Sequence, residues 1–294
     1  MIWPLLLDVI ALTPLLTLVG IVFWKRRQLD SDERRDPLCD ELHLLPGQSA
    51  QQRIEQLAEA RIDRLVFVIT SSLIAAMVIA ARRIGVETRP WDWFDSVICL
   101  ISLGTAIFFG LRLTRDLPLQ RKYRQGMRAE QATAQLIGAS LAGDNRIIHD
   151  VQCGEFNIDH VAITPGGIFA IETKSRLKPP VGNGSPRVKY DGKTLDFGAW
   201  KEDKPIDQAN RQARWLANYL RKETGETYAA TAVVSLPGWY VERTARISPE
   251  MVQVINPKNS RWLLLPEKKI PVLDSPKIQR AANAVEKLAR AKSE

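Results

Sequence analysis

The chain has few residues of the kinds that build soft-metal sites or disulfide frameworks. It holds three cysteines and three histidines among 294 residues. The cysteines are odd in number and widely spaced, and no CxxC or HExxH motif supplies zinc-ligand spacing. Internal repeats and low-complexity tracts are also missing. These absences exclude a disulfide-stapled secreted domain and a motif-based zinc enzyme, and they predict reduced, unpaired cysteines.

The charge balance is basic, and the hydrophobic residues are unevenly distributed. Lys and Arg number 41 against 33 Asp and Glu, which gives a net charge of +8. A basic balance favours nucleic acid or a lipid bilayer as a partner, although it says nothing about fold. Three apolar runs stand in the first part of the chain: Ile2–Trp24, Leu65–Ala81 and Trp91–Leu113. Each approaches the roughly 20 residues that a helix needs to cross a bilayer.

The charges that flank these runs predict their orientation. Lys25-Arg26-Arg27 follows the first run at once, which is the reverse of a signal peptide, so we expect an uncleaved membrane helix. More basic residues lie between the first two runs and after the third than in the short link between the second and third. The positive-inside rule then places the N-terminus outside and the C-terminal domain in the cytoplasm. The expected location is the inner (cytoplasmic) membrane, with several spans.

Two features of this region leave alternatives open. Asp8 and Asp95, within or beside apolar runs, mark either a proton or ion path or positions at the water interface near helix ends. The second run is short, so a buried soluble hairpin is the alternative to a membrane span. The apolar spacing of Ala50–Arg64 predicts an amphipathic cytoplasmic helix that leads into the second run.

The segment Gly154–Arg176 predicts a patch of carboxylates on a sheet, because two β-type runs flank a turn. With Pro165 and Gly166 at the centre of that turn, the register pairs three sets of residues: Ile163 with Ile168, Val161 with Ala170, and Asp159 with Glu172. Alternation places Lys174 on the face of Glu172. Paired carboxylates repel and need a proton or a cation such as Mg²⁺, which indicates metal-assisted hydrolysis of a phosphate ester. A salt bridge with Lys174 on an exposed face is the structural alternative.

Periodicity after the third apolar run predicts a mixed α/β domain. Helices are expected over Lys122–Leu141, Asp207–Lys222 and Ser275–Lys292. Strands are expected over Arg146–Val151, the two runs around the turn, a hairpin at Val188–Leu195, and then Tyr228–Ser235 and Val252–Ile255. This order predicts an α/β sandwich with a mixed sheet. The expected segments are a membrane helix over 1–24, a charged linker over 25–64, two membrane helices over 65–113, a nuclease-like domain over 122–240, and a C-terminal strand and helix over 241–294.

Four blocks in this domain resemble the nuclease-related domain, called NERD, of the PD-(D/E)xK nuclease-like superfamily. They are Ile158-Asp159-His160-Val161, the GGIFAIETK stretch over 166–174, Pro205-Ile206-Asp207-Gln208, and Glu130 on the first helix, where Ala129 stands in place of the usual glycine. The resemblance runs from about Arg124 to Ser235. It implies a mixed sheet flanked by helices, which here follows a three-helix transmembrane region.

The resemblance also implies a catalytic site. It assigns Mg²⁺ or Mn²⁺ to Asp159 and Glu172, with Glu130 as a further ligand, and the ion would polarise the scissile phosphate. Lys174 would orient the attacking water or stabilise charge on the phosphate. Gln208 would contact a bound water or a phosphate oxygen, and it completes the expected catalytic set with Asp159, Glu172 and Lys174. The structural alternatives are a solvated Glu130 and a Gln208 that only begins its helix.

The remaining candidates concern the substrate. Arg211 and Arg214 follow Gln208 on one helix and are expected either to contact a nucleic-acid backbone or to be solvated. His160 points away from Asp159 and is expected to pack or to form a hydrogen bond. The predicted function is a membrane-anchored, metal-dependent endonuclease that acts on DNA rather than RNA. The alternatives are a catalytically weak nucleic-acid-binding or sensing module at the membrane, and a membrane sensor or assembly protein.

Overall fold

The contacts of the chain divide it into two units. The computed structural model describes residues 45–83, 90–139, 145–180, 186–263 and 273–290, together with Trp24 and Arg27. The hairpin unit comprises residues 1–41 and 55–119, and the sheet unit comprises residues 42–54 and 120–294. The first predicted apolar run lies outside the described residues apart from Trp24, and so does Asp8.

Two long helices account for the hairpin unit and extend beyond it. Helix α2 (Gln48–Ala81) joins the predicted amphipathic helix to the second apolar run, as the sequence indicated. Helix α3 (Trp93–Gly138) joins the third apolar run to the helix predicted over residues 122–141. The sequence predicted two separate elements, and the structure has one. The helix contains Pro118 and continues through it.

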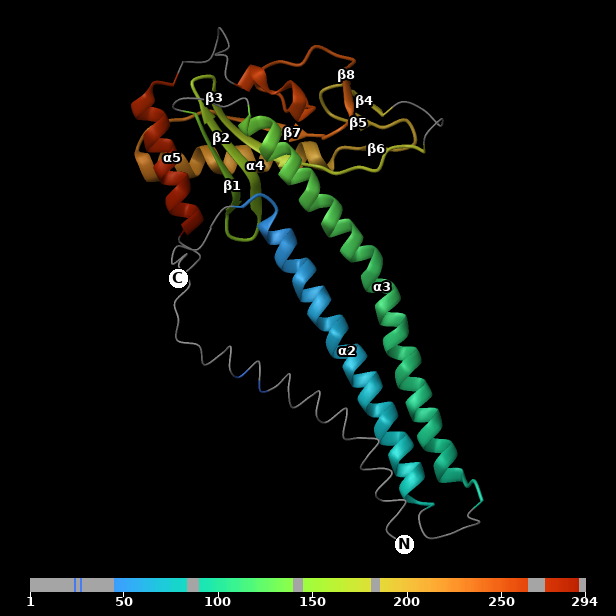
Figure 1. Cartoon of the computed structure of the whole chain (residues 1–294). Coiled ribbons are helices and arrows are strands. Elements are labelled where there is room, and N and C mark those ends of the chain that lie inside the picture. Colours follow the sequence, from blue (N-terminus) through green and yellow to red (C-terminus); the bar gives the residue numbers. More distant parts are fainter. Residues whose placement is uncertain are drawn as a thin grey trace. The chain divides into compact units, whose positions relative to one another are not determined.

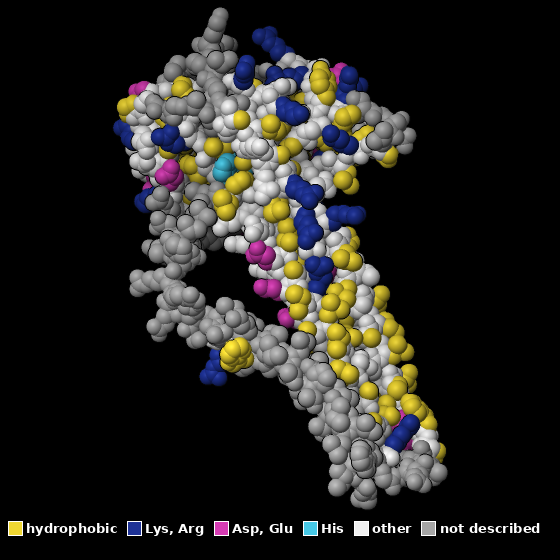
Figure 2. Space-filling model, viewed as in Figure 1, with side chains coloured by type: hydrophobic (Ala, Val, Ile, Leu, Met, Phe, Trp, Pro, Cys, Tyr) yellow, Lys and Arg dark blue, Asp and Glu magenta, His cyan; other side chains and the backbone are white. Residues whose placement is uncertain are grey.

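Both helices are long and apolar enough to be candidate membrane spans. None of the residues in their apolar windows is buried inside the protein, and the exposed side chains include Phe67, Leu100 and Phe108. Hydrophobic side chains gather along these helices (Figure 2). A large exposed apolar surface marks contact with lipid or with another protein. The described residues therefore contain two candidate spans, whereas the sequence predicted three for the whole chain.

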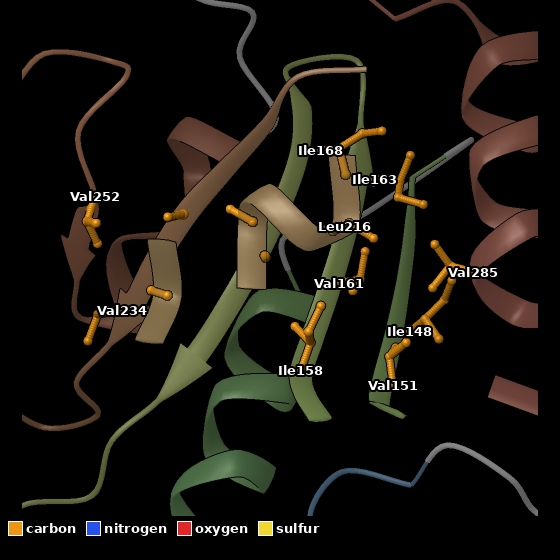
Figure 3. Close-up of a cluster of buried hydrophobic side chains, with 14 of the residues drawn as sticks. Ile148, Val151, Ile158, Val161, Ile163, Ile168, Leu216, Val234, Val252 and Val285 are labelled. Atoms are coloured by element: carbon orange, nitrogen blue, oxygen red, sulfur yellow. The ribbon is translucent and has the colours of Figure 1, made fainter. Parts of the chain in front are cut away.

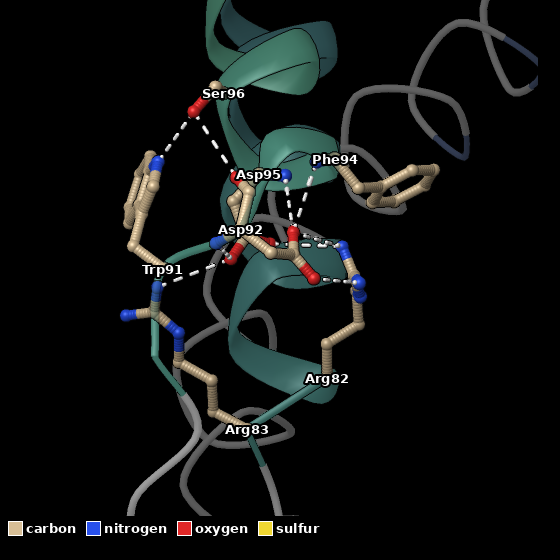
Figure 4. Close-up of polar contacts among 7 residues, drawn as sticks. All are labelled: Arg82, Arg83, Trp91, Asp92, Phe94, Asp95 and Ser96. Atoms are coloured by element: carbon tan, nitrogen blue, oxygen red, sulfur yellow. Dashed lines mark hydrogen bonds and ion pairs between the residues drawn. The ribbon is translucent and has the colours of Figure 1, made fainter.

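Ion pairs join the residues at the end of α2 to those at the start of α3 (Figure 4). Arg82 contacts Asp92 at 2.8 Å and Asp95 at 3.1 Å, and Arg83 contacts Asp95 at 3.4 Å. Asp92 also accepts hydrogen bonds from the N–H groups of Phe94 and Asp95, so it caps the start of α3. Asp95 is only 2% exposed. The ion pairs with Arg82 and Arg83 balance the charge of the buried Asp95. Its burial therefore has a structural explanation that does not involve an ion path.

The sheet unit is built on a five-stranded mixed sheet, as predicted (Figure 1). Its spatial order is β1-β2-β3-β7-β9, with antiparallel pairing from β1 to β3 and parallel pairing from β3 to β9. The strands are β1 (Arg146–Gln152), β2 (Asn157–Thr164), β3 (Gly167–Thr173), β7 (Ala230–Ser235) and β9 (Gln253–Ile255).

The turn between β2 and β3 has the predicted register. Ile163 pairs with Ile168 and Val161 pairs with Ala170, with Pro165 and Gly166 between the strands. Gly167 adopts a φ of 138°, a backbone conformation that favours glycine. The paired ladder ends at His160 and Ile171, one step before the predicted pair of carboxylates.

A smaller second sheet is formed by segments that lie, in sequence, between strands of the first sheet. Its order is β6-β5-β4-β8, and it contains β4 (Arg187–Tyr190), β5 (Leu195–Asp196), β6 (Lys201–Glu202) and β8 (Tyr240–Arg243). The predicted hairpin is confirmed, because Lys189 pairs with Asp196 and Tyr190 with Leu195. Strand β8 was not predicted, and it pairs in parallel with β4.

Helices cover both faces of the five-stranded sheet. Helices α4 (Lys204–Thr224) and α5 (Ser275–Arg290) pack on one face, where Leu216 and Val285 join the main core with Ile148 and Val161 (Figure 3). On the opposite face, Ile137 of α3 packs with residues that include Phe169, Ile171 and Val233. Helix α4 ends at Gly225, whose φ of 74° allows its N–H to bond the carbonyl of Arg221.

The packing of α4 yields a stability prediction. Leu216→Ala removes a fully buried side chain and should lower the free energy of unfolding of the sheet unit by about 2–5 kcal/mol. Leu177→Ala is the matched control, because Leu177 is 74% exposed, and it should change this free energy by less than about 0.5 kcal/mol. Denaturant unfolding of the full chain in detergent, followed by tryptophan fluorescence, measures both. Equal effects of the two substitutions would contradict the assigned core.

Candidate functional site

Two buried carboxylates lie where β2 and β3 run side by side. Asp159 is 7% exposed and Glu172 is 3% exposed. The backbone N–H of Thr173 donates to Oδ2 of Asp159 at 2.7 Å, which ties this side chain of β2 to the end of β3. Oδ1 of Asp159 accepts no hydrogen bond from the described residues. The strands therefore bring the two predicted carboxylates together and leave an acceptor oxygen available.

Lys174 bridges Glu172 and helix α4. Its backbone N–H donates to the carbonyl of Ser235 at 2.9 Å, which fixes the chain just after β3. Its Nζ lies 2.5 Å from Oε1 of Glu172 and donates to Oε1 of Gln208 at 3.0 Å. The predicted sharing of one face by Glu172 and Lys174 is what allows this contact. Gln208 reaches the site from the first turn of α4, and its side chain holds the ammonium group.

Gln212 is a site residue that the sequence reasoning missed. It lies one turn after Gln208 on α4 and is 1% exposed. Its Nε2 donates to Oε2 of Glu172 at 2.6 Å and to the carbonyl of Asn157 at 2.9 Å. Residues four apart share a helix face, so the spacing from Gln208 was the available signal. Both oxygens of Glu172 are therefore engaged, one by Lys174 and one by Gln212.

Glu130 approaches the same cluster from the part of α3 that belongs to the sheet unit. Burial raises its pKa to about 7, and the negative charges of Asp150 and Glu172 add to this rise. Lys174 and the backbone N–H of Gly47 act in the opposite direction. Asp150 was not a predicted site residue, and it brings another carboxylate close to Glu130.

The surroundings of Asp159 disfavour its charged form. Burial raises its pKa well above the ordinary value, and repulsion from Glu172 and Glu130 raises it further. The Thr173 N–H and the Lys174 charge lower it by less. One ammonium group therefore faces three carboxylates, and the surplus negative charge favours either a proton or a cation.

The donor chemistry fits a hard divalent cation. Carboxylate oxygens are its preferred ligands, and Mg²⁺ is commonly held by one or two carboxylates while waters and substrate phosphates complete its shell. Among the described residues, no group of three or more His, Cys, Asp and Glu side chains is arranged as a metal cage. Asp159 and Glu172 are consequently the pair that would hold the ion, and Glu130 lies close enough to interact with both.

The other predicted candidates lie outside this cluster. Arg211 and Arg214 are exposed on α4, and in the part of the chain that the structure describes no ion pair joins either of them to the carboxylates. His160 is fully buried and its Nδ1 lies 2.8 Å from Nδ1 of His149, so one ring donates to the other. Burial and the neighbouring His149 lower the pKa of His160 to about 3. His160 therefore has the packing and hydrogen-bonding role that alternation predicted.

Comparison with known families agrees with the fold and the motifs. Residues 125–237 match the NERD family, described as the nuclease-related domain, and this span is less than half of the chain. No curated protein and no solved structure matches the chain. The matched segment holds Glu130, Asp159, Glu172, Lys174 and Gln208. It also contains Gln212 and most of the mixed sheet. The family match supports a nuclease-like module in this part of the protein.

The raised carboxylate pKa values give a pH prediction for the metal-free protein. The folded protein holds the Glu130 proton more tightly than the unfolded chain, because the pKa rises from 4.5 to about 7 on folding. The free energy of unfolding should therefore fall as pH rises from about 4.5 to about 7. Asp159 acts in the same direction.

Thermal melting in EDTA between pH 4.5 and 8 tests this, with Glu130→Gln as the comparison. The variant keeps the shape of the side chain without its titration, so its melting temperature should depend less on pH. Parallel pH profiles for the two proteins would show that Glu130 does not carry the effect.

Proposed function

We propose that the sheet unit is a metal-dependent phosphodiesterase that acts on nucleic acid, with DNA as the first substrate to test. The observation that carries this proposal is the buried pair Asp159 and Glu172, contacted by Lys174 and held between two strands and a helix. Strongly perturbed carboxylates beside a specific cation are typical of functional sites. The match of residues 125–237 to a nuclease-related family supports the same reaction class.

The side chains can be given distinct tasks. Asp159 and Glu172 would hold Mg²⁺ or Mn²⁺, with Glu130 as a further ligand. A bound ion supplies neutralising charge and polarises a phosphate oxygen. Lys174 lies beside Glu172 and would present its ammonium group to the negative charge that builds up on the phosphate.

The two glutamines keep this arrangement in place. Gln208 accepts a hydrogen bond from Nζ of Lys174 and so fixes the direction in which the ammonium group points. Gln212 occupies the second oxygen of Glu172 and the Asn157 carbonyl, which limits rotation of the carboxylate. Arg211 and Arg214 are exposed on the same helix and would contact backbone phosphates in a salt-dependent way.

A second function is favoured by one observation. The described residues contain no closed group of three metal-binding side chains, and Glu172 already has two partners. A module that binds or senses nucleic acid with little cleavage would need no such group. The presence of Asp159, Glu172 and Lys174 together favours the enzyme, since simple phosphate binding does not need two buried carboxylates.

Cleavage by variants of the full chain tests the enzyme. Asp159→Asn and Glu172→Gln should each lower both Mg²⁺ binding and cleavage of plasmid and oligonucleotide DNA. Lys174→Ala should retain Mg²⁺ binding, because it removes only positive charge, while cleavage falls about 10²-fold or more. Asp196→Asn is the control, since this half-buried carboxylate of β5 lies in the second sheet and pairs with Lys201.

The measurements are gel-based cleavage with Mg²⁺ or Mn²⁺ and calorimetric titration of the metal. DNA binding without cleavage under every divalent ion would favour the binding module. Full cleavage by Lys174→Ala would remove its assigned role and leave the carboxylate assignment standing.

The membrane part of the proposal is tested separately. Basic residues flank the two candidate spans, and by the positive-inside rule they support a multi-pass protein whose C-terminus lies in the cytoplasm. The chain should resist extraction from membranes by alkaline carbonate. A reporter active only in the cytoplasm should work when fused after Glu294, and one active only outside should not. The reverse reporter pattern would exclude this topology.

A further inference from the structure

Asp150 has an unusual backbone conformation in the middle of β1. Its φ is 47°, and it is the one non-glycine residue with a positive φ among the residues that the structure describes. Asp tolerates this region better than most residues, but the conformation persists only when surrounding contacts hold it. The side chain is 6% exposed and lies next to the site, because its charge acts on Glu130.

The contacts that hold Asp150 come mainly from the first turn of α2. Ser49 donates its backbone N–H to Oδ2 at 2.7 Å, and its hydroxyl lies 2.7 and 2.9 Å from the two carboxylate oxygens. Asn157 and Gln152 add amide donors to Oδ1 at 2.8 and 3.1 Å. Gln152 also contacts the hydroxyl of Ser49 at 3.2 Å. Both oxygens of this buried carboxylate therefore accept hydrogen bonds.

The residue before this turn approaches α3 beside Glu130. Gly47 has a φ of 80°, and a Cβ atom at this position would come within 2.8 Å of Cγ of Met127, which lies three residues before Glu130 on α3. A glycine is thus required for the start of α2 to lie so close to α3. The start of α2 therefore contacts Asp150 through Ser49 and packs against α3 next to Glu130 through Gly47.

Asp150 also stands close to the candidate site. It lies between His149 and Val151, which pair with His160 and Ile158, so it is opposite Asp159 in the register of β1 and β2. A helix N-terminus carries partial positive charge on its unpaired N–H groups and stabilises nearby anions. The start of α2 therefore favours a carboxylate at this position, where Ser49 donates its N–H.

We infer that the first turn of α2 completes the candidate site, and that Asp150 is a positioning residue which holds this turn through Ser49 and thereby fixes Glu130. The inference rests on the proposed function for its catalytic consequence. Since α2 continues into a candidate membrane span, the contact gives the membrane helix a direct influence on the site. Loss of the contact would free Glu130 without removing any of the proposed metal ligands.

The test uses the full chain in detergent with three variants and a control. Asp150→Asn replaces acceptor oxygen by an amide and should break the contact. Ser49→Ala removes the hydroxyl but keeps the N–H, so its effect should be smaller than that of Asp150→Asn. Ser49→Thr keeps a hydroxyl and should preserve the contact with Asp150. Asp191→Asn is the matched control, because this exposed carboxylate also accepts two backbone N–H groups but lies in the turn after β4.

Two readouts are measured. Hydrogen exchange of residues 45–54 should speed up in Asp150→Asn and Ser49→Ala relative to wild type and to Asp191→Asn. In cleavage assays, kcat should fall about tenfold for Asp150→Asn and the half-saturating Mg²⁺ concentration should rise, while KM for DNA stays unchanged. A loss that came from general unfolding would change KM and exchange throughout the sheet unit.

The outcomes separate this inference from the proposed function. If the wild type cleaves DNA and Asp150→Asn matches it in kcat and Mg²⁺ dependence, the inference is wrong and the function stands. Unchanged exchange over residues 45–54 would also overturn it. If the wild type does not cleave, calorimetric Mg²⁺ affinity decides: weaker binding by Asp150→Asn supports the inference, and equal or absent binding in both proteins overturns it.

Discussion

The candidate site depends on how one buried carboxylate, Glu172, is held. An ionised carboxylate in a protein interior is costly unless its charge is balanced and its oxygens are hydrogen-bonded. Lys174 supplies the opposite charge at 2.5 Å, and Gln212 supplies the second hydrogen bond at 2.6 Å. Gln212 belongs to α4 and lies on the helix face that buries Ala209 and Leu216 against the sheet, so the same packing that buries these residues brings Gln212 to Glu172.

The balance around Glu172 does not extend to its neighbours. Lys174 also lowers the pKa values of Asp159 and Glu130, but burial and mutual repulsion raise both by more. A proton would relieve this excess in the free protein, and a divalent cation would relieve it while leaving the carboxylates ionised. The proton and the cation would compete for the same carboxylate oxygens. A divalent cation at these carboxylates would supply the polarising charge that the proposed phosphodiester hydrolysis requires.

The sequence contained the information for the local parts of this site. The Pro165-Gly166 turn set the register of β2 and β3, and alternation placed Glu172 beside Lys174. Other features depend on distant contacts. Strand β8 is four residues long and forms only because β4 is available to pair with it. The contact between Ser49 and Asp150 joins residues 101 positions apart through a backbone conformation that no local pattern encodes.

The two long helices differ in the continuity of their backbone hydrogen bonds. Each begins or ends in the sheet unit and contains a candidate span. Helix α3 contains Pro118, which lacks the N–H for one helical hydrogen bond, directly before the division between the units at Leu119 and Gln120. Helix α2 has neither proline nor glycine between Gln48 and Ala81. An uninterrupted hydrogen-bond ladder resists bending better than one broken by proline. The helix whose first turn contacts Asp150 is therefore the one with the more continuous hydrogen-bond ladder.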